Sequence, residues 1–375
     1  MDRYRRFAEL TDEEIRADFK EQADERREAE LSKVVLLDLT TSTADELPHP
    51  AVAAAISFAA KRALNQQPDA LSSELRDRVS AETGIDTENV AVGPGADGLM
   101  AALVAKLVAK DEQILIPWPS YRLHPLLAGI VGAQPIPLTV PREPEAIASA
   151  ANAAGRAPVM VLTNPNDPDG HLIDAEGIAQ LRAKLTPKTV LIVDEALIDY
   201  AGDNHIHRMN ELVADTPGLF LVRSMSKAWG LSGLKVGWVL AGPGGEEVLQ
   251  SLTPLLGVPA PSEAGALAAL DEAKQQRNAR VAAVSTEKAR LEALLRSSTV
   301  DIGPSDANLV WASVPGIGSA ELAAKLRDAG VLVRDGAEVG EPTRICAAIR
   351  GDQTATDRLA EGLLEAAGQA PSSAD

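Results

Sequence analysis

The feature that most constrains this chain is a repeated alternation, between residues 89 and 240, of short apolar runs with longer stretches of helical pattern. The runs are rich in Val, Ile and Leu without strict alternation, as in strands buried on both faces. They cover 89–92, 113–117, 158–162, 189–193, 219–222 and 236–240, and helical segments such as 96–109 and 175–185 lie between them. This rhythm predicts an α/β domain with a mainly parallel sheet.

The pattern changes after residue 250, where long Ala- and Glu-rich helical stretches flank short strand candidates near Leu309, Val331 and Ile345. With 375 residues the chain is long enough for two or three domains. We expect a helical arm over 1–33, a large domain over 34–250 whose first part can pack with the small domain, a small α+β domain over 251–367, and a tail over 368–375. The arm is either docked on the body or solvated, and the sequence favours neither.

Composition narrows the class of protein. The net charge is −18 and the pI is near 4.8, which argues against nucleic acid and anionic membranes, since phosphate binding needs clustered Lys and Arg. No apolar run has the length of a signal-peptide core or a membrane span. The single Cys346 fits a reducing compartment. These features predict a soluble, cytoplasmic protein with no metal centre, because the five histidines show no ligand spacing.

Polar clusters follow four of the expected strands. They are Gly93-Pro-Gly-Ala-Asp97, Thr163-Asn-Pro-Asn-Asp-Pro-Asp-Gly170, Asp194-Glu195 and Arg223-Ser-Met-Ser-Lys227. The carboxyl ends of parallel strands meet at one crevice, so these clusters should converge. A lysine can form a Schiff base once it is desolvated, an acid can hold a pyridine nitrogen protonated, and a helix N-terminus with serine hydroxyls suits a phosphate. Together they suit a phosphorylated carbonyl cofactor.

The segment SMSKAWGLSGLKVGW over 224–238 resembles the pyridoxal-lysine segment of class I/II aminotransferases, the fold-type I group of pyridoxal-phosphate enzymes. Residues 164–170 and 194–197 resemble two further motifs of that group, and the order matches over roughly 35–367. Within the group, the histidinol-phosphate aminotransferase branch looks most similar, on segments 305–308, 330–335 and 343–345. The resemblance implies a large domain with a mainly parallel seven-stranded sheet and a smaller α+β domain.

The resemblance also assigns roles around pyridoxal 5′-phosphate. Lys227 would form the Schiff base and shuttle the substrate proton, and Asp194 would pair with the ring nitrogen. Tyr121 would stack on the ring, although a packed core tyrosine is the alternative. The phosphate would lie among Gly95, Ala96, Asp97, Ser224 and Ser226, unless these form a plain strand-to-helix turn.

For the substrate, the resemblance implies that Arg344 grips a carboxylate with help from Asn308, and that Arg334 meets a substrate phosphate. A surface salt bridge is the alternative for Arg344, and an ordinary surface position for Arg334. A two-fold homodimer is also implied, with Gln67 near the partner's cofactor phosphate.

Several positions depart from the family pattern. Asp167 and Leu197 replace an Asn and a Tyr that normally donate to the cofactor's phenolic oxygen. Lys235 replaces an Arg at the phosphate, and Gln67 replaces the tyrosine of a Tyr-Pro pair. The leading interpretation is an aminotransferase acting on an amino acid or amino-alcohol, with or without a phosphate, and a 2-oxo acid. The alternatives are another reaction on the same cofactor, such as decarboxylation, or a silent binding protein of the same fold.

Overall fold

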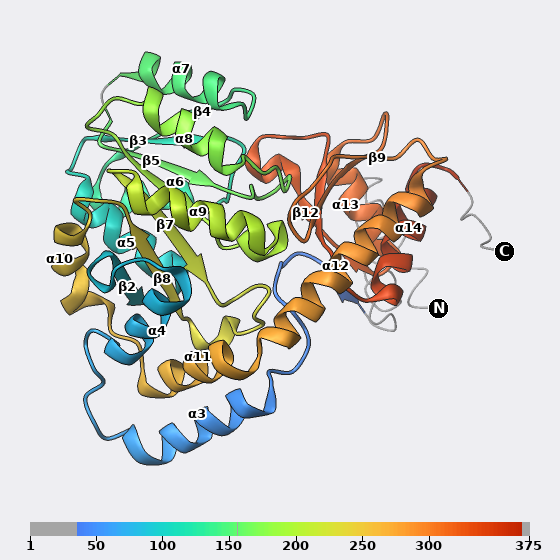
Figure 1. Ribbon diagram of the computed structural model, residues 1–375. Helices are drawn as coiled ribbons and strands as arrows, with labels where there is room; N and C mark the ends of the chain where they lie inside the picture. The colour runs from blue at the N-terminus through green and yellow to red at the C-terminus, as the bar shows by residue number, and fades with distance from the viewer. Residues whose placement is uncertain (1–35, 156, 370–375) are drawn as a thin grey trace, which may run out of the picture.

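The computed structural model describes residues 36–155 and 157–369. The expected arm over 1–33 lies outside these residues. Figure 1 shows a large domain beside a smaller one, with the long helix α12 (Lys274–Leu295) running from the first to the second. Among the described residues, no helix combines the length and the apolar character that a membrane crossing requires.

The large domain is built on a seven-stranded sheet in the order β2-β8-β7-β6-β5-β3-β4. Strand β8 is antiparallel to both its neighbours, and the other pairs are parallel. This confirms the expected fold class. The strands are β2 (Val90–Gly93), β3 (Gln113–Pro117), β4 (Gln134–Leu138), β5 (Val159–Thr163), β6 (Val190–Asp194), β7 (Leu219–Ser224) and β8 (Gly237–Ala241).

Strand β4 is the one that the apolar runs did not predict. It contains Pro135 and Pro137, and it pairs only with β3 at the edge of the sheet. Proline has no N–H to donate, so it is tolerated at an edge and not in a central strand.

Helices cover both faces of this sheet, because neighbouring strand residues point to opposite sides. In β3, Ile114 and Ile116 pack in the core under one layer of helices, and Leu115 packs under the other. The first layer holds α5 (Gly95–Leu107), α6 (His124–Val131) and α10 (Glu246–Leu256). The second holds α4 (Ser73–Thr83), α7 (Pro144–Ala154), α8 (Ala175–Lys184) and α9 (Asp203–Asp215).

The smaller domain has a separate apolar core, in which Val310, Ile345 and Leu359 are almost fully buried. Its four-stranded antiparallel sheet has the order β12-β13-β10-β9, and β1 pairs with β11 in a parallel two-stranded sheet. The elements are β1 (Leu37–Asp38), β9 (Asp301–Ile302), β10 (Leu309–Ser313), β11 (Val331–Leu332), β12 (Arg334–Asp335), β13 (Ile345–Ala348), α13 (Ser319–Asp328) and α14 (Gln353–Ala366). Because β1 belongs to this domain, the start of the described chain packs with its end.

The packing places the change of domain later than residue 250. Helix α11 (Ala260–Glu272) packs along α3 (Pro50–Ala63), and Ala266 and Leu270 lie in the large-domain core. In α12, Val284 and Leu291 lie in the small-domain core. Packing with the large-domain core thus extends through α11, and packing with the small-domain core begins within α12. The described residues also include four short 3-10 turns, which are η1 (Thr87–Asn89), η2 (Ile198–Ala201), η3 (Ser232–Leu234) and η4 (Gly336–Val339).

Candidate active site

A cavity of about 190 Å³ lies at the carboxyl ends of β5, β6 and β7. Of the residues singled out from the sequence, it is lined by Ala96, Asp97, Tyr121, Asp167, Asp194, Leu197, Ser224, Ser226, Lys227 and Lys235. Residues that lie between positions 96 and 235 of the sequence thus come together in one cavity, as expected at the carboxyl ends of parallel strands. Ser42, Thr163, Ala196 and Ser232 also line the cavity, and the sequence assigned these residues no individual role.

Lys227 enters the cavity from the turn that follows β7. This turn is held by the backbone, since Gly230 N–H donates to Lys227 O at 3.0 Å and Met225 N–H donates to Val236 O at 3.1 Å. Burial lowers the pKa of the Lys227 amine below its usual value, although Asp167 and then Asp194 act in the opposite direction. A lower pKa gives a larger fraction of free amine, which is the nucleophilic form.

Asp194 ends β6 and stands in a buried chain of polar side chains. His124 Nε2 lies 3.0 Å from Asp194 Oδ2, and His124 Nδ1 lies 3.3 Å from Thr163 Oγ1. The Thr163 hydroxyl in turn lies 2.8 Å from Ser120 Oγ. A carboxylate accepts hydrogen bonds, so His124 Nε2 is placed to donate to Asp194 while Nδ1 faces the Thr163 hydroxyl. The imidazole therefore fixes the direction in which Asp194 faces the cavity.

His124 is a residue to which the sequence assigned no role. The signal was its position three residues after Tyr121, just before the Pro at the start of a helix. The two rings meet edge to face with centroids 5.4 Å apart. Burial raises the pKa of Tyr121, and the nearby Asp97 and Asp194 add to that effect. Tyr121 is thus a neutral ring at the cavity wall, packed on the side chain that orients Asp194.

The opposite end of the cavity has the chemistry of a phosphate site. Helix α5 begins at Gly95, whose φ of +76° lies in the left-handed region that favours glycine. Ser226 N–H and Ser226 Oγ both lie within hydrogen-bond distance of Ser224 Oγ, at 3.1 and 2.9 Å. Lys235 Nζ lies 3.3 Å from Asp97 Oδ2. A helix N-terminus, hydroxyls and an ammonium converge here.

Asp167 has a partner from the other domain. Arg334 Nη1, on β12, lies 2.8 Å from Asp167 Oδ1, and Arg334 Nη2 donates to Cys346 Sγ at 2.8 Å. Burial lowers the pKa of Arg334, but Cys346 and Asp167 outweigh burial and raise it. Burial also raises the pKa of the Cys346 thiol to about 12. The Arg334 guanidinium therefore stays protonated and forms an ion pair with Asp167.

Other predicted substrate residues do not line the cavity. Arg344 donates to Trp311 O at 3.0 Å and pairs with Asp301. Asn308 is buried and donates to the carbonyl of Ser42, a cavity residue, at 3.1 Å. Gln67 is exposed in the loop before α4 and does not line this cavity. Asn308 is thus one residue removed from the site, and the structure does not bring Arg344 or Gln67 to it.

Taken together, the donors fit pyridoxal phosphate. A desolvated lysine amine, a carboxylate at the end of β6 and a phosphate-type turn at the start of α5 face the same cavity. Gly95, which starts α5, is not itself a lining residue, but its neighbours Ala96 and Asp97 are. When bound, the cofactor would be held by Lys227, with Asp194 at its ring nitrogen and Lys235, Ser224 and Ser226 at its phosphate.

Comparisons with known proteins agree with this arrangement. The family model described as aminotransferase class I and II matches residues 34–363. A histidinol-phosphate aminotransferase of Rubrobacter xylanophilus is 32% identical over 85% of this chain and 89% of its own. An aromatic amino acid aminotransferase of Mycolicibacterium vanbaalenii is 31% identical over 81% of this chain and 86% of its own.

Among solved structures, a histidinol-phosphate aminotransferase of Sinorhizobium meliloti in complex with pyridoxal-5′-phosphate is similar in fold. Its TM-score is 0.76 at 23% identity, and the match covers 92% of this chain and 94% of that one. The similarity thus spans both domains.

Proposed function

This chain belongs to the class I and II aminotransferase family and is a pyridoxal-phosphate-dependent aminotransferase, and we propose that Lys227 is the residue that bonds to its cofactor. The observation that carries this proposal is the desolvated Lys227 amine in the same cavity as the buried Asp194. The alternatives of decarboxylation and of a silent binding protein are not favoured, because the relatives that match most of the chain are aminotransferases.

The chemistry that pyridoxal phosphate supplies when bound is an electron-accepting ring next to the substrate Cα. Asp194, held by His124, keeps a proton at the ring nitrogen. The Lys227 amine moves a proton to and from the substrate Cα as a general base and acid, which its lowered pKa favours. Tyr121 and Leu197 cover the cavity walls and exclude water.

We propose that the amino donor is an unphosphorylated amino acid and that the acceptor is a 2-oxo acid. Arg334, the candidate for a substrate phosphate, already pairs with the buried Asp167. Moving it to a phosphate would leave a buried carboxylate unpaired, which is strongly unfavourable. The cavity also holds three carboxylates, Asp97, Asp167 and Asp194, against two lysines. Asn308, which donates to the cavity residue Ser42, remains a candidate near the substrate carboxylate, whereas Arg344 lies outside the cavity and pairs with Asp301.

A donor screen tests the substrate class. Phenylalanine, a substrate of the kind named for the aromatic relatives, should be turned over with a higher kcat/KM than histidinol phosphate, the substrate named for the other relative. A preference for histidinol phosphate would overturn the argument from Arg334 and leave the role of Lys227 untouched.

We also propose a two-fold homodimer, in which Gln67 approaches the partner's cofactor phosphate. On the outside of α6 and in the turn before it, Leu123, Leu126 and Ile130 are exposed, and on α3 Phe58 is 63% exposed. Large exposed apolar side chains at these spacings suit a subunit interface. Light scattering should give twice the 39.4 kDa of one chain, and a monomer at micromolar concentration would contradict this. A cytoplasmic location remains a prediction from the single cysteine.

The assignment of Lys227 is tested by spectrum and by mapping. Wild-type protein should absorb visible light through its lysine-bound cofactor, and borohydride reduction should fix a pyridoxyl group on Lys227. Lys227→Ala should lose that absorption and nearly all turnover, whereas Lys188→Ala, at a lysine outside the cavity, should keep both. A pyridoxyl group on Lys235 would show that the assignment is wrong.

A further inference from the structure

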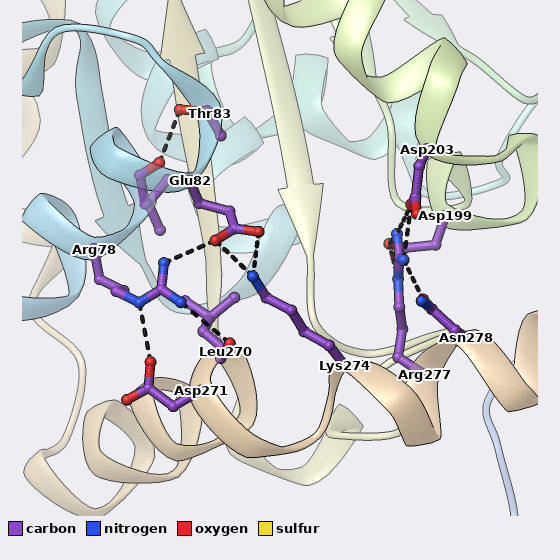
Figure 2. Close-up of polar contacts among 11 residues, drawn as sticks. Arg78, Glu82, Thr83, Asp199, Asp203, Leu270, Asp271, Lys274, Arg277 and Asn278 are labelled. Atoms are coloured by element: carbon purple, nitrogen blue, oxygen red, sulfur yellow. Dashed lines mark hydrogen bonds and ion pairs between the residues drawn. The ribbon is translucent and has the colours of Figure 1, made fainter.

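A second and larger cavity, of about 410 Å³, lies against the other side of β7 and β8, between α4 and α9. Its floor consists of strand side chains, and its walls come from α4, α9 and the junction of α11 with α12. In Figure 2 the strands run between the residues of α4 and those of α9, with α11 and α12 beneath. The volume is in the usual range for small-molecule sites. Only Ser224 also lines the cofactor cavity.

The floor presents two buried donors side by side. Arg223 on β7 and Trp238 on β8 are partners in the antiparallel register, and they are only 4% and 7% exposed. Arg223 donates through Nε to Glu195 at 2.7 Å and through Nη1 to Asn210 at 2.7 Å. Arg223 Nη2 and Trp238 Nε1 have no acceptor among the described protein atoms. Buried N–H groups are normally hydrogen-bonded, so this pair points to a ligand with acceptor oxygens.

The rim charges are already paired, as Figure 2 shows. Lys274 Nζ lies 2.6 Å from Glu82 Oε1, and Arg277 lies 3.0 Å from Asp199 and 2.8 Å from Asp203. Lys274 and Arg277 thus each have carboxylate partners, whereas Arg223 Nη2 is a buried guanidinium donor without a protein acceptor among the described residues. A small anion should therefore bind at the floor and not at the rim.

Part of the remaining wall is apolar and aromatic. Ile198, Ile206 and Leu270 line the cavity, together with Trp229, whose ring lies 5.6 Å below the Arg277 guanidinium. A ligand that fills this space needs an apolar body as well as its acceptor group. Trp229 follows Lys227 by two residues, so this wall belongs to the same turn that carries the catalytic lysine.

We propose that this cavity is a second ligand site, which takes a small monocarboxylate with an apolar or aromatic body. The two carboxylate oxygens accept from Arg223 Nη2 and Trp238 Nε1, and charge-assisted bonds to a guanidinium are the stronger kind. The body packs on Trp229 and Ile206. Because Ser224 and the turn to Lys227 separate the two cavities, an occupant here contacts the back of the catalytic turn without entering the cofactor cavity.

The test is a calorimetric titration of the cofactor-loaded protein with benzoate, with benzamide as the uncharged probe of the same shape. Benzoate should bind saturably and at least several-fold more tightly than benzamide. Trp238→Phe keeps an aromatic ring but removes the N–H, so it should weaken benzoate binding about fivefold, in line with the loss of one neutral hydrogen bond. Equal affinity for the two probes would overturn the proposal.

A blocking variant locates the site independently. Ile206→Trp fills the cavity from α9 and should abolish this binding, whereas Leu212→Trp, half-buried on the same helix and outside the cavity, should leave it unchanged. A crystal soaked with benzoate should show the carboxylate at Arg223 and Trp238. Benzoate binding that survives Ile206→Trp, or benzoate found only in the cofactor cavity, would refute the proposal. Both tests remain decisive if Trp238→Phe fails to fold.

Discussion

Two carboxylates face Lys227, and they are held in different ways. Asp194 is supported by His124, Thr163 and Ser120, all from the ends of strands or the turns beside them in the large domain. Asp167 is supported by Arg334, which lies on the small-domain strand β12. The first support exists whenever the large domain is folded. The ion pair that supports Asp167 exists only when the small domain lies against the large one. The position of Asp194 therefore depends on one domain, and that of Asp167 depends on both.

The comparison predicts the largest effect at Asp194. Asp194→Ala removes the acid at the ring nitrogen, so turnover should fall about a thousandfold, with little change in the folded structure. Steady-state kinetics and circular dichroism measure the two quantities. Asp86→Asn, at an exposed loop acid, serves as the control. Turnover within tenfold of wild type would show that Asp194 is not the ring partner.

The second prediction concerns the pair across the domains. Arg334→Leu leaves Asp167 buried without its cation and should lower the free energy of unfolding by about 3 kcal/mol. The double variant Arg334→Leu, Asp167→Leu should recover most of that loss. Arg344→Leu breaks a pair whose partner Asp301 is 60% exposed, and it should cost less than about 1 kcal/mol. Denaturant unfolding of the four proteins provides the comparison, and similar losses for both arginines would remove the distinction.

A smaller effect is expected at His124, which positions Asp194 without touching the substrate. His124→Asn should lower kcat about tenfold and leave KM nearly unchanged, because the orientation of Asp194 matters to the reaction and not to substrate binding. The pH dependence of the cofactor's absorption band should shift in this variant, which a purely structural role would not cause. An unchanged band with a raised KM would argue against the positioning role.

The smallest effect is a shift in protonation. Burial lowers the pKa of Lys227, and Asp167 is the group that most strongly opposes this. Asp167→Asn removes the negative charge, so the pKa of the apoprotein's Lys227 should fall further, and the free amine should persist to lower pH. The rate of cofactor incorporation as a function of pH should therefore move its midpoint down. Asp169→Asn should leave the midpoint in place, and an upward shift would contradict the sign.

The sequence could predict what depends on local pattern. Buried runs of Val, Ile and Leu predicted the central strands, and their ends predicted the meeting of Lys227 with Asp194. The prolines of β4 made this segment look unlike a strand, because proline is compatible with a strand only at the edge of a sheet and the sequence does not show which strand is at the edge. Composition does not show where helices α10 and α11 pack: both resemble the helices that follow them, but their buried residues lie in the large-domain core.

The contacts between side chains of the two domains could not be predicted from the sequence, because they too depend on how distant segments pack. Asp167 and Arg334 come from different domains, and no local pattern shows that they meet. The expected roles of Arg334 at a substrate phosphate and of Arg344 at a carboxylate came from resemblance alone. The structure gives both side chains protein partners. His124 was visible in the sequence, but its role follows only from the 3.0 Å contact with Asp194.

Helix α12 is a continuous helix that connects the cores of the two domains. At its start, Arg277 is tied to Asp199, and Arg280 donates to the carbonyl of Ala228 in the turn after Lys227. Its later turns belong to the small-domain core. The segment between β1 and α3 is a further connection, because β1 and Leu39 belong to the small domain and α3 packs on the large one. Because α12 is continuous from one core to the other and Arg280 holds the turn after Lys227, a rotation of the small domain would bend this helix or pull on the turn that presents Lys227.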